Sequence, residues 1–246
     1  MFKIEKPVHM KLQITIKGLD DKLILDENYI EFIQSMIYCQ IEKIDPDFSK
    51  ELHDKKTYKH FTFSKLLGVN YKNGKYVVKN TSVVFTISTT NKALMNIINK
   101  SFKLYDIINI GELKFIIIGR NLITNPLTEN TIFSSDDKGI VIVKTQNDEH
   151  NYIKPDSDEY EKLFFERLNN RLNKKYSADE LSNFKLKIIS EPKKNSIVYK
   201  GDKIWGWKYD FTINCPDDIM REGYYSGFGN HTTKGMGYTY IKNKTR

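Results

Sequence analysis

The sequence has few cysteines and no long hydrophobic run. Cys39 and Cys215 are the only two cysteines among 246 residues, too few for a disulfide framework or a four-thiolate zinc site. The longest aliphatic runs, such as residues 115–118, are strand-sized, whereas a membrane helix needs roughly 20 apolar residues. The first residues, MFKIEKPVHMKLQ, carry charges where a secretory signal needs an apolar segment. We therefore expect a folded, cytoplasmic protein with no membrane partner.

Arginine is scarce although the chain is basic. Only five of the 39 basic residues are arginines, so 39 − 5 = 34 are lysines, and the net charge is +8. Such a charge favours an anionic partner without identifying it. Residues 50–80 hold eight lysines against two acids, a local charge of 8 − 2 = +6. A solvated basic face and an anion-binding surface explain this stretch equally well.

Hydrophobic periodicity predicts the order β-α-β-β-α-β in the first half of the chain. The first helix, whose isoleucines recur at helical spacing, is expected to begin with a capping box formed by Asn28 and Glu31. The next two strands are expected to form a hairpin that turns at Asn73-Gly74. The predicted elements are a strand at 10–17, a helix at 28–44, strands at 60–67 and 75–88, a helix at 92–103 and a strand at 111–120.

The second half is predicted to repeat this order after a linker at residues 121–130. Its expected elements are a strand at 140–144, a helix at 159–175, a strand at 184–189, a hairpin at 197–213 turning at Gly201-Asp202, a helix at 216–225 and a strand at 238–242. Each half matches the ferredoxin-like unit. We predict an α+β protein of two tandem ferredoxin-like domains, 1–124 and 125–246, although no sequence repeat links them.

Glycine is concentrated near the C-terminus. Five of the 13 glycines lie within residues 223–237, yet this segment fits neither a Walker A motif nor a dinucleotide fingerprint, so nucleotide cofactors are disfavoured. Glycines let backbone amides approach phosphates, and Lys234 with the hydroxyls of Thr232 and Thr233 would contact the same backbone. An RNA strand suits this chemistry. The alternative is a tight loop that needs positive φ angles for structural reasons alone.

The segment 234–240 also approximates the RNP1 pattern of RNA-recognition folds, with Met236 in place of the usual aromatic residue. Tyr238 and Tyr240 would share one face of a strand. They either stack on bases or fill the core, and core filling is the commoner role of such residues.

Two distant motifs resemble those of the CRISPR-associated endoribonucleases that cut repeat RNA into guide RNAs. Gly227-Phe228-Gly229 with Lys234-Gly235-Met236-Gly237 resembles the family's glycine-rich loop, whose second half is usually Gly-Phe-Gly. Met36-Ile37-Tyr38, Leu52-His53 and then residues 58–64 follow the order and spacing of its active-site region. The family consists of two ferredoxin-like domains, so the resemblance extends over the whole chain in topology.

The resemblance implies a metal-independent endoribonuclease without a cofactor that acts on CRISPR repeat RNA. An interference complex is a further candidate partner. The 2′-hydroxyl would attack the neighbouring phosphate, leaving a 5′-hydroxyl and a cyclic or 2′/3′-phosphate end. His53 would transfer protons, Lys59 would neutralise charge on the phosphorane, and Tyr38 would donate a hydrogen bond to it. The residues expected to bind RNA are Gly227, Gly229, His231, Thr232, Thr233, Lys234, Gly235 and Gly237.

The residues leave several alternatives open. His60, next to Lys59, is the rival of His53 as the catalytic imidazole, and Tyr58 is expected either to pack or to contact RNA. The rival function is a non-catalytic repeat-RNA-binding protein of the same superfamily, in which His53 is incidental. A generic RNA-recognition module is a third option, although such modules do not need the glycine-rich loop.

Overall fold

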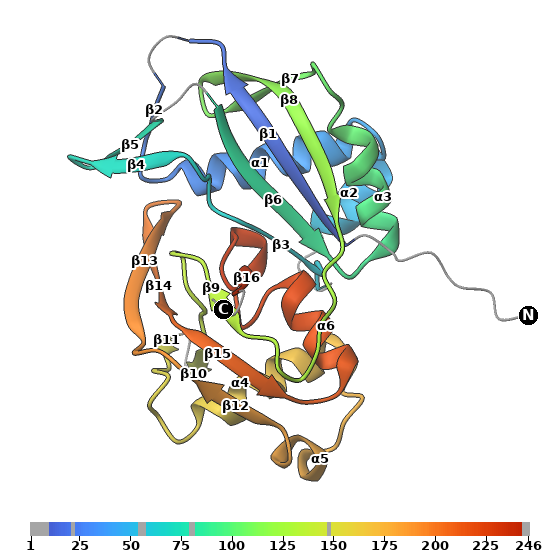
Figure 1. Cartoon of the computed structure of the whole chain (residues 1–246), viewed down its shortest axis with the longest axis vertical. Helices are drawn as coiled ribbons and strands as arrows, with labels where there is room; N and C mark the ends of the chain where they lie inside the picture. Colours follow the sequence, from blue (N-terminus) through green and yellow to red (C-terminus); the bar gives the residue numbers. More distant parts are fainter. Residues whose placement is uncertain (1–9, 21–22, 54–57, 79–81, 147–148, 243–246) are drawn as a thin grey trace, which may run out of the picture.

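The computed structural model describes residues 10–20, 23–53, 58–78, 82–146 and 149–242. The N-terminal half forms the upper part of the molecule in Figure 1 and the C-terminal half the lower part. None of the helices in these ranges is long and apolar enough to cross a membrane.

The N-terminal half is a five-stranded antiparallel sheet with helices on one face (Figure 1). Leu12, Ile14 and Ile16 alternate along its central strand and are each 0% exposed, because they face the helices. The strands, in spatial order, are β3 (Phe61–Phe63), β6 (Ser82–Thr89), β1 (Lys11–Gly18), β8 (Leu113–Ile123) and β7 (Ile107–Ile110). The helices are α1 (Tyr29–Glu42), α2 (Pro46–His53) and α3 (Lys92–Ser101).

The C-terminal half is built on a four-stranded sheet around an aromatic core. The rings of Phe164, Phe211 and Phe228 lie within 6.0 Å of one another, measured between centroids. The strands, in spatial order, are β12 (Lys185–Ile188), β15 (Asp210–Asn214), β9 (Phe133–Ser135) and β16 (Thr239–Ile241). The helices are α4 (Tyr160–Arg171), α5 (Ala178–Ser182) and α6 (Asp217–Ser226).

The two sheets share one strand order. If the four main strands of each half are numbered along the chain, both sheets run 2-3-1-4, and β7 is an added edge strand in the first. This is the ferredoxin-like arrangement, so the predicted double ferredoxin-like fold is confirmed. The division at residues 124 and 125 stays a prediction.

Three small sheets extend this frame. The hairpin of β13 (Lys193–Tyr199) and β14 (Asp202–Lys208) turns at Lys200-Gly201, one residue before the predicted Gly201-Asp202. A second hairpin, β4 (Val69–Lys72) and β5 (Lys75–Val78), pairs with β2 (Ile24–Leu25). The third is β10 (Val143–Gln146) with β11 (Glu149–Tyr152), and a single 3₁₀ turn, η1 (Thr232–Lys234), lies in the glycine-rich segment.

Several local predictions are wrong. The Asn73-Gly74 turn joins β4 to β5 rather than two strands of the main sheet. The strands β3 and β6 do pair, but the separate β4–β5 hairpin lies between them in the sequence. Asn28 makes no capping hydrogen bond with its side chain, and Glu31 instead accepts one from the backbone amide of Lys200 at 3.0 Å. The expected linker begins later, because β8 continues to Ile123.

The expected strands of the C-terminal half also need correction. The first strand of the main sheet is β9, whose three residues are too few to show an alternating pattern, whereas Ile140 and Val141 form only isolated bridges. The predicted strand that follows Gly201-Asp202 divides in two at Tyr209. Its second part, β15, enters the main sheet, and its first part, β14, stays in the hairpin.

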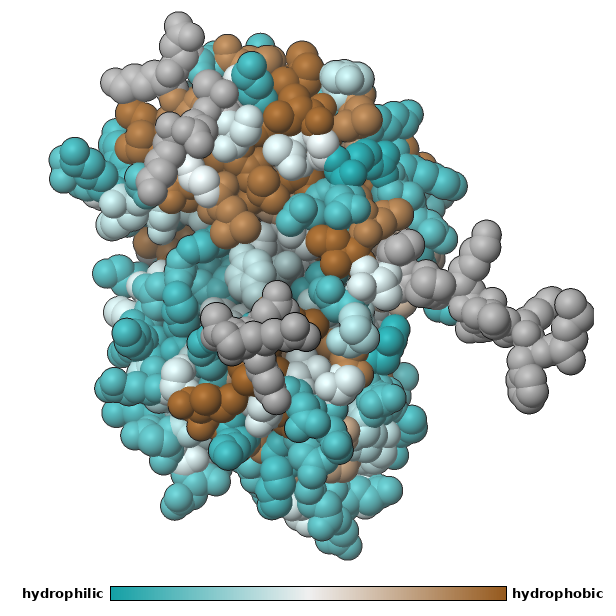
Figure 2. Space-filling model, in the orientation of Figure 1, coloured by the Kyte–Doolittle hydropathy of each residue, from teal (hydrophilic) through white to brown (hydrophobic). Residues whose placement is uncertain are grey.

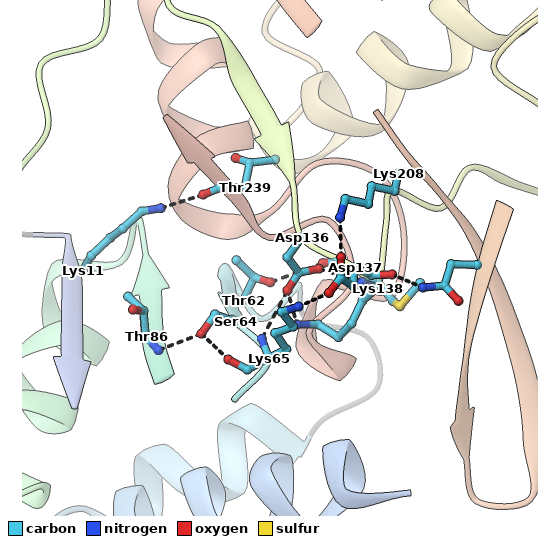
Figure 3. A network of polar contacts seen from close by, with 12 residues as sticks. Lys11, Thr62, Ser64, Lys65, Thr86, Asp136, Asp137, Lys138, Lys208 and Thr239 are labelled. Atoms are coloured by element: carbon cyan, nitrogen blue, oxygen red, sulfur yellow. Dashed lines mark hydrogen bonds and ion pairs between the residues drawn. The ribbon is translucent and has the colours of Figure 1, made fainter. Parts of the chain in front are cut away.

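A polar junction joins the two halves (Figure 3). The backbone amide of Lys65 donates to Oδ2 of Asp136 at 3.2 Å, and the ammonium group of Lys138 pairs with the same carboxylate. Lys65 and Lys208 both contact Asp137 through their ammonium groups. Because the Asp136 carboxylate is fully buried, these charge-assisted contacts fix the end of β3 against the C-terminal half.

Candidate active site

Tyr38 and His53 meet at the junction of the first two helices. Tyr38 lies on α1 beside the isoleucine stripe, partly packed against the core, and His53 is the last residue of α2. Their rings stack with centroids 4.7 Å apart and planes inclined by 28°. The imidazole is exposed whereas the phenol is half-buried. Burial, with a smaller effect from Tyr199, raises the pKa of Tyr38 to about 12, so its hydroxyl remains protonated at neutral pH.

Lys59 lies two residues before β3, a strand held at three points by the C-terminal half. Nδ1 of His60 lies 3.3 Å from Oε1 of Glu222 at the start of the strand. The hydroxyl of Thr62 donates to the carbonyl oxygen of Met236 at 3.2 Å, and Lys65 contacts Asp136 at the far end. Lys59 itself is half-buried. The backbone beside this candidate cation is therefore fixed by contacts from the other half of the molecule.

The glycine-rich loop follows α6 and is closely packed. Its glycines at 227, 229, 235 and 237 all have positive φ, between 71° and 93°. A Cβ atom at Gly237 would lie 1.9 Å from the carbonyl oxygen of Phe228. The amides of Gly235 and Gly237 donate within the protein, to Thr232 and Gly139. These glycines therefore shape the loop; their assignment to RNA binding stays a prediction.

The more accessible side chains of the loop are those of its 3₁₀ turn and of the residue before it. Thr233, Lys234 and His231 are half-buried, whereas Thr232 is buried and its hydroxyl lies 3.0 Å from that of Tyr58. Burial and the nearby Lys234 lower the pKa of His231 to about 4. His231 is therefore neutral at physiological pH, and any contact with RNA would use a neutral imidazole.

Gln34 links the loop to the helix that carries Tyr38. Its Nε2 donates to the carbonyl oxygen of Thr233 at 2.8 Å, and its Oε1 accepts from the hydroxyl of Tyr199 on β13. The ammonium group of Lys234 lies 4.5 Å from the centre of the Tyr199 ring. Gln34 precedes Tyr38 by one helical turn, so the loop, the hairpin and the candidate catalytic helix meet here.

His60 occupies a different environment from His53. It lies before β3 rather than in a strand as predicted, with φ of 43°. Its ring faces Glu222, which is 2% exposed and also accepts from the hydroxyl of Thr90 at 2.8 Å. Burial alone would raise the pKa of Glu222, but contacts with His60, Arg171 and Thr90 outweigh this effect and hold the pKa below its usual value. His60 is thus paired with a buried carboxylate, and the choice of His53 over His60 as the catalytic imidazole stays a prediction.

Tyr58 packs beneath the glycine-rich loop. The guanidinium carbon of Arg171 lies 4.4 Å from the centre of its ring, and Arg171 donates to the carbonyl oxygens of Gly227 and Gly229. Tyr58 therefore packs, and contact between Tyr58 and RNA stays a prediction. Tyr238, at 2% exposure, likewise belongs to the core rather than to a base-stacking surface. Lys55, Lys56 and Lys79 of the basic stretch lie outside the described residues.

Sequence reasoning missed Gln34, Tyr199, Glu222 and Arg171. Only Arg171 carried a signal, because a chain with five arginines and 34 lysines retains arginine where a planar, two-pronged donor is needed. Gln34, Tyr199 and Glu222 are residue types common in helices and strands, and no local sequence pattern marks them as part of a functional site.

Family models match both halves of the chain. The N-terminal model of the CRISPR-associated protein Cas6 matches residues 24–119, and the C-terminal model matches residues 136–241. The chain belongs to the Cas6 family. Tyr38, His53 and Lys59 lie within the first match and the glycine-rich loop within the second.

Individual relatives agree with this assignment. The chain is 25% identical to the CRISPR-associated endoribonuclease Cas6 1 of Methanocaldococcus jannaschii, over 93% of this chain and 91% of that protein. It is 24% identical to the CRISPR-associated endoribonuclease-like protein Cas6nc of Pyrococcus horikoshii, over 95% and 99% of the two chains. A solved structure described as an RAMP protein binding different RNA substrates has the same fold, with a TM-score of 0.81, 22% identity and coverage of 96% and 100%.

Proposed function

We propose that this Cas6 family member is a metal-independent endoribonuclease that cuts CRISPR repeat RNA into guide RNAs. The 2′-hydroxyl of the nucleotide before the scissile phosphate attacks phosphorus, forming the O2′–P bond as the P–O5′ bond breaks. The products are a 2′,3′-cyclic phosphate, or the 2′- or 3′-phosphate formed when it opens, and a 5′-hydroxyl. One proton leaves the 2′-oxygen and one reaches the departing 5′-oxygen.

The stacked pair of Tyr38 and His53 is the observation that carries this proposal. An exposed imidazole whose ring is held by a second ring can reach the RNA in a fixed orientation. His53 transfers protons, a contribution on the order of 10²–10⁴-fold. Tyr38, which keeps its proton up to a pKa of about 12, donates a hydrogen bond to the charged phosphorane oxygen, and Lys59 supplies a positive charge.

RNA binding is assigned to the face formed by the glycine-rich loop. Lys234 provides a charge for a phosphate, while His231 and Thr233 provide neutral hydrogen-bonding groups beside it. The connection through Gln34 supports this assignment, because it brings the loop against the helix of Tyr38. RNA held by the loop would thus lie near His53. The names of the relatives, an endoribonuclease and an endoribonuclease-like protein, agree with this substrate.

The decisive experiment replaces one nucleotide of the substrate. Repeat RNA with a single 2′-deoxynucleotide before the scissile phosphate should bind normally but remain uncut, because the nucleophile is missing. The all-ribose RNA should be cut once, with equal rates in excess EDTA and in magnesium. Cleavage of the deoxy substrate, or activity that EDTA abolishes and magnesium restores, contradicts the mechanism. Tight binding of all-ribose repeat RNA without any cut favours the non-catalytic alternative.

A further inference from the structure

The hairpin of β13 and β14 carries an aromatic side chain between two lysines, remote in sequence from every predicted site residue. The ammonium group of Lys194 lies 4.2 Å from the centre of the Trp205 ring, and that of Lys203 lies 6.0 Å from it. Residues 193–208 hold five lysines and one aspartate, a net charge of 5 − 1 = +4. The hairpin is therefore one of the most basic segments of the chain.

The register of the hairpin separates its two faces. Ile197 pairs with Ile204, and both are buried, at 8% and 4% exposure, against the core of the N-terminal half. Ser196 pairs with Trp205, so Trp205 points to the opposite face, where it is partly exposed. Trp207, the other tryptophan of the chain, is buried at 6% exposure in the C-terminal core. Only one indole ring is thus presented at the surface.

The surroundings of Trp205 are polar and basic. The surface of the lower half, where the hairpin lies in Figure 1, is mainly hydrophilic, whereas hydrophobic side chains gather over the upper half (Figure 2). The carboxylates nearby are already paired with other lysines: Asp136 with Lys138, and Asp137 with Lys65 and Lys208. Neither Lys194 nor Lys203 has a carboxylate partner among the residues that the structure describes.

A groove of about 490 Å³ lies beside this hairpin and leads towards the N-terminal half. Lys203 lines it together with Ser196, and Tyr71 and Tyr76 of the β4–β5 hairpin line the other side. Tyr71 is 58% exposed. Lysines with interleaved aromatic rings are the arrangement that binds single-stranded nucleic acid, because ammonium groups follow phosphates and rings stack on bases.

We propose that Trp205, flanked by Lys194 and Lys203, is a stacking platform for an unpaired segment of the RNA. A base displaces one lysine from the indole face, and that lysine then contacts the adjacent phosphate. This inference rests on the proposed function for the identity of the RNA, but it assigns a separate site with no part in the chemistry. The hairpin also contacts the candidate catalytic helix through Tyr199 and Gln34, on the face opposite Trp205.

Tryptophan fluorescence provides a direct test. The repeat RNA with one 2′-deoxynucleotide, and separately a short oligouridylate, are titrated into the wild-type protein and into Trp205→Leu, Trp205→Phe and Lys194→Gln/Lys203→Gln variants. Lys187→Gln, an exposed lysine on β12, is the matched charge control. Circular dichroism melting establishes that each variant is folded.

The platform predicts quenching of the wild-type fluorescence by both RNAs. Trp205→Leu should bind at least about fivefold more weakly, the loss expected from one stacked base, and Trp205→Phe should retain most of the affinity without the quenching. The double lysine variant should lower the salt dependence of binding, whereas Lys187→Gln should not.

Two outcomes separate this inference from the proposed function. The stacking proposal is wrong if Trp205→Leu binds both RNAs as tightly as the wild type and RNA quenches the fluorescence of neither protein. This conclusion would hold even if the protein still cuts repeat RNA. If repeat RNA is never cut but Trp205-dependent quenching and affinity persist, the nuclease proposal fails and the platform stands. Saturating RNA should restore the wild-type cleavage rate to Trp205→Leu, because Trp205 acts on binding alone.

Discussion

Gln34 and Thr233 are 199 positions apart in the sequence and are joined by a hydrogen bond of 2.8 Å from Nε2 of Gln34 to the carbonyl oxygen of Thr233. The same amide group accepts a hydrogen bond from Tyr199. One side chain of α1 therefore orients both the glycine-rich loop and the basic hairpin relative to Tyr38.

Gln34→Glu should lower the cleavage rate by about 10-fold or more at saturating repeat RNA. The carboxylate has nearly the same shape but cannot donate to Thr233, so the loop shifts relative to Tyr38, and small displacements of positioned groups are costly to rate. Single-turnover kinetics measure this effect. Ser35→Ala, one residue along on an exposed position, is the control. An unchanged rate in Gln34→Glu would show that the amide bridge does not position the site.

His53→Ala and His60→Ala should have opposite effects. His53 is exposed, so its loss should abolish or strongly reduce cleavage while RNA affinity changes only a few-fold and the fold stays intact. His60 faces the buried Glu222, so its loss should lower the free energy of unfolding by about 1–3 kcal/mol and leave much of the cleavage. Urea unfolding and single-turnover assays distinguish the two. The reverse pattern would make His60 the catalytic imidazole.

Lys234→Ala should weaken repeat-RNA binding and reduce the dependence of affinity on salt. Removing one phosphate contact lowers the slope of log K against log salt by about 0.7 to 0.9. Filter binding across a salt series measures this slope, and Lys187→Ala serves as the control for net charge. Equal affinities and slopes for wild type and Lys234→Ala would restrict the loop to a structural role.

Gly237→Ala should destabilise the protein far more than Gly201→Ala. Both glycines have positive φ, 71° and 84°, so both substitutions strain the backbone by about 1–2 kcal/mol. A Cβ atom meets nothing within 4 Å at Gly201 but would lie 1.9 Å from the Phe228 carbonyl oxygen at Gly237. Gly237→Ala should therefore cost about 3 kcal/mol or more in the free energy of unfolding. Similar urea midpoints for the two variants would contradict the packed loop.

His231 should make the protein less stable in mild acid. Burial holds its pKa at about 4 in the folded protein, below its ordinary value of 6.5, so the unfolded chain binds the additional proton between these values. Stability is therefore complete above pH 6.5 and falls as the pH drops towards 4, by up to about 3 kcal/mol. Urea midpoints of wild type and His231→Gln, measured across pH 4–8, give the part of the pH dependence that is due to His231. The contribution of Glu222, whose pKa is also lowered, is present in both proteins and cancels in the comparison. Parallel curves would show that His231 is not held neutral in the folded protein.

The sequence by itself determined the order of the main elements and the placement of the two candidate catalytic side chains on them. Apolar residues at helical spacing form α1 and set Tyr38 beside its isoleucine stripe, and Pro46 begins the short helix that ends at His53. These features are local, because hydrophobic periodicity and proline act within a few residues.

Only the tertiary structure decided which distant groups meet. A turn signal such as Asn73-Gly74 marks where the chain reverses but does not identify the strands of the main sheet, and β9 is too short to produce a pattern. The contacts of Gln34 with Thr233 and of His60 with Glu222 span 199 and 162 positions. They form because the two sheets pack with β3 against the glycine-rich loop, and their energy comes from burial that no short window of sequence contains.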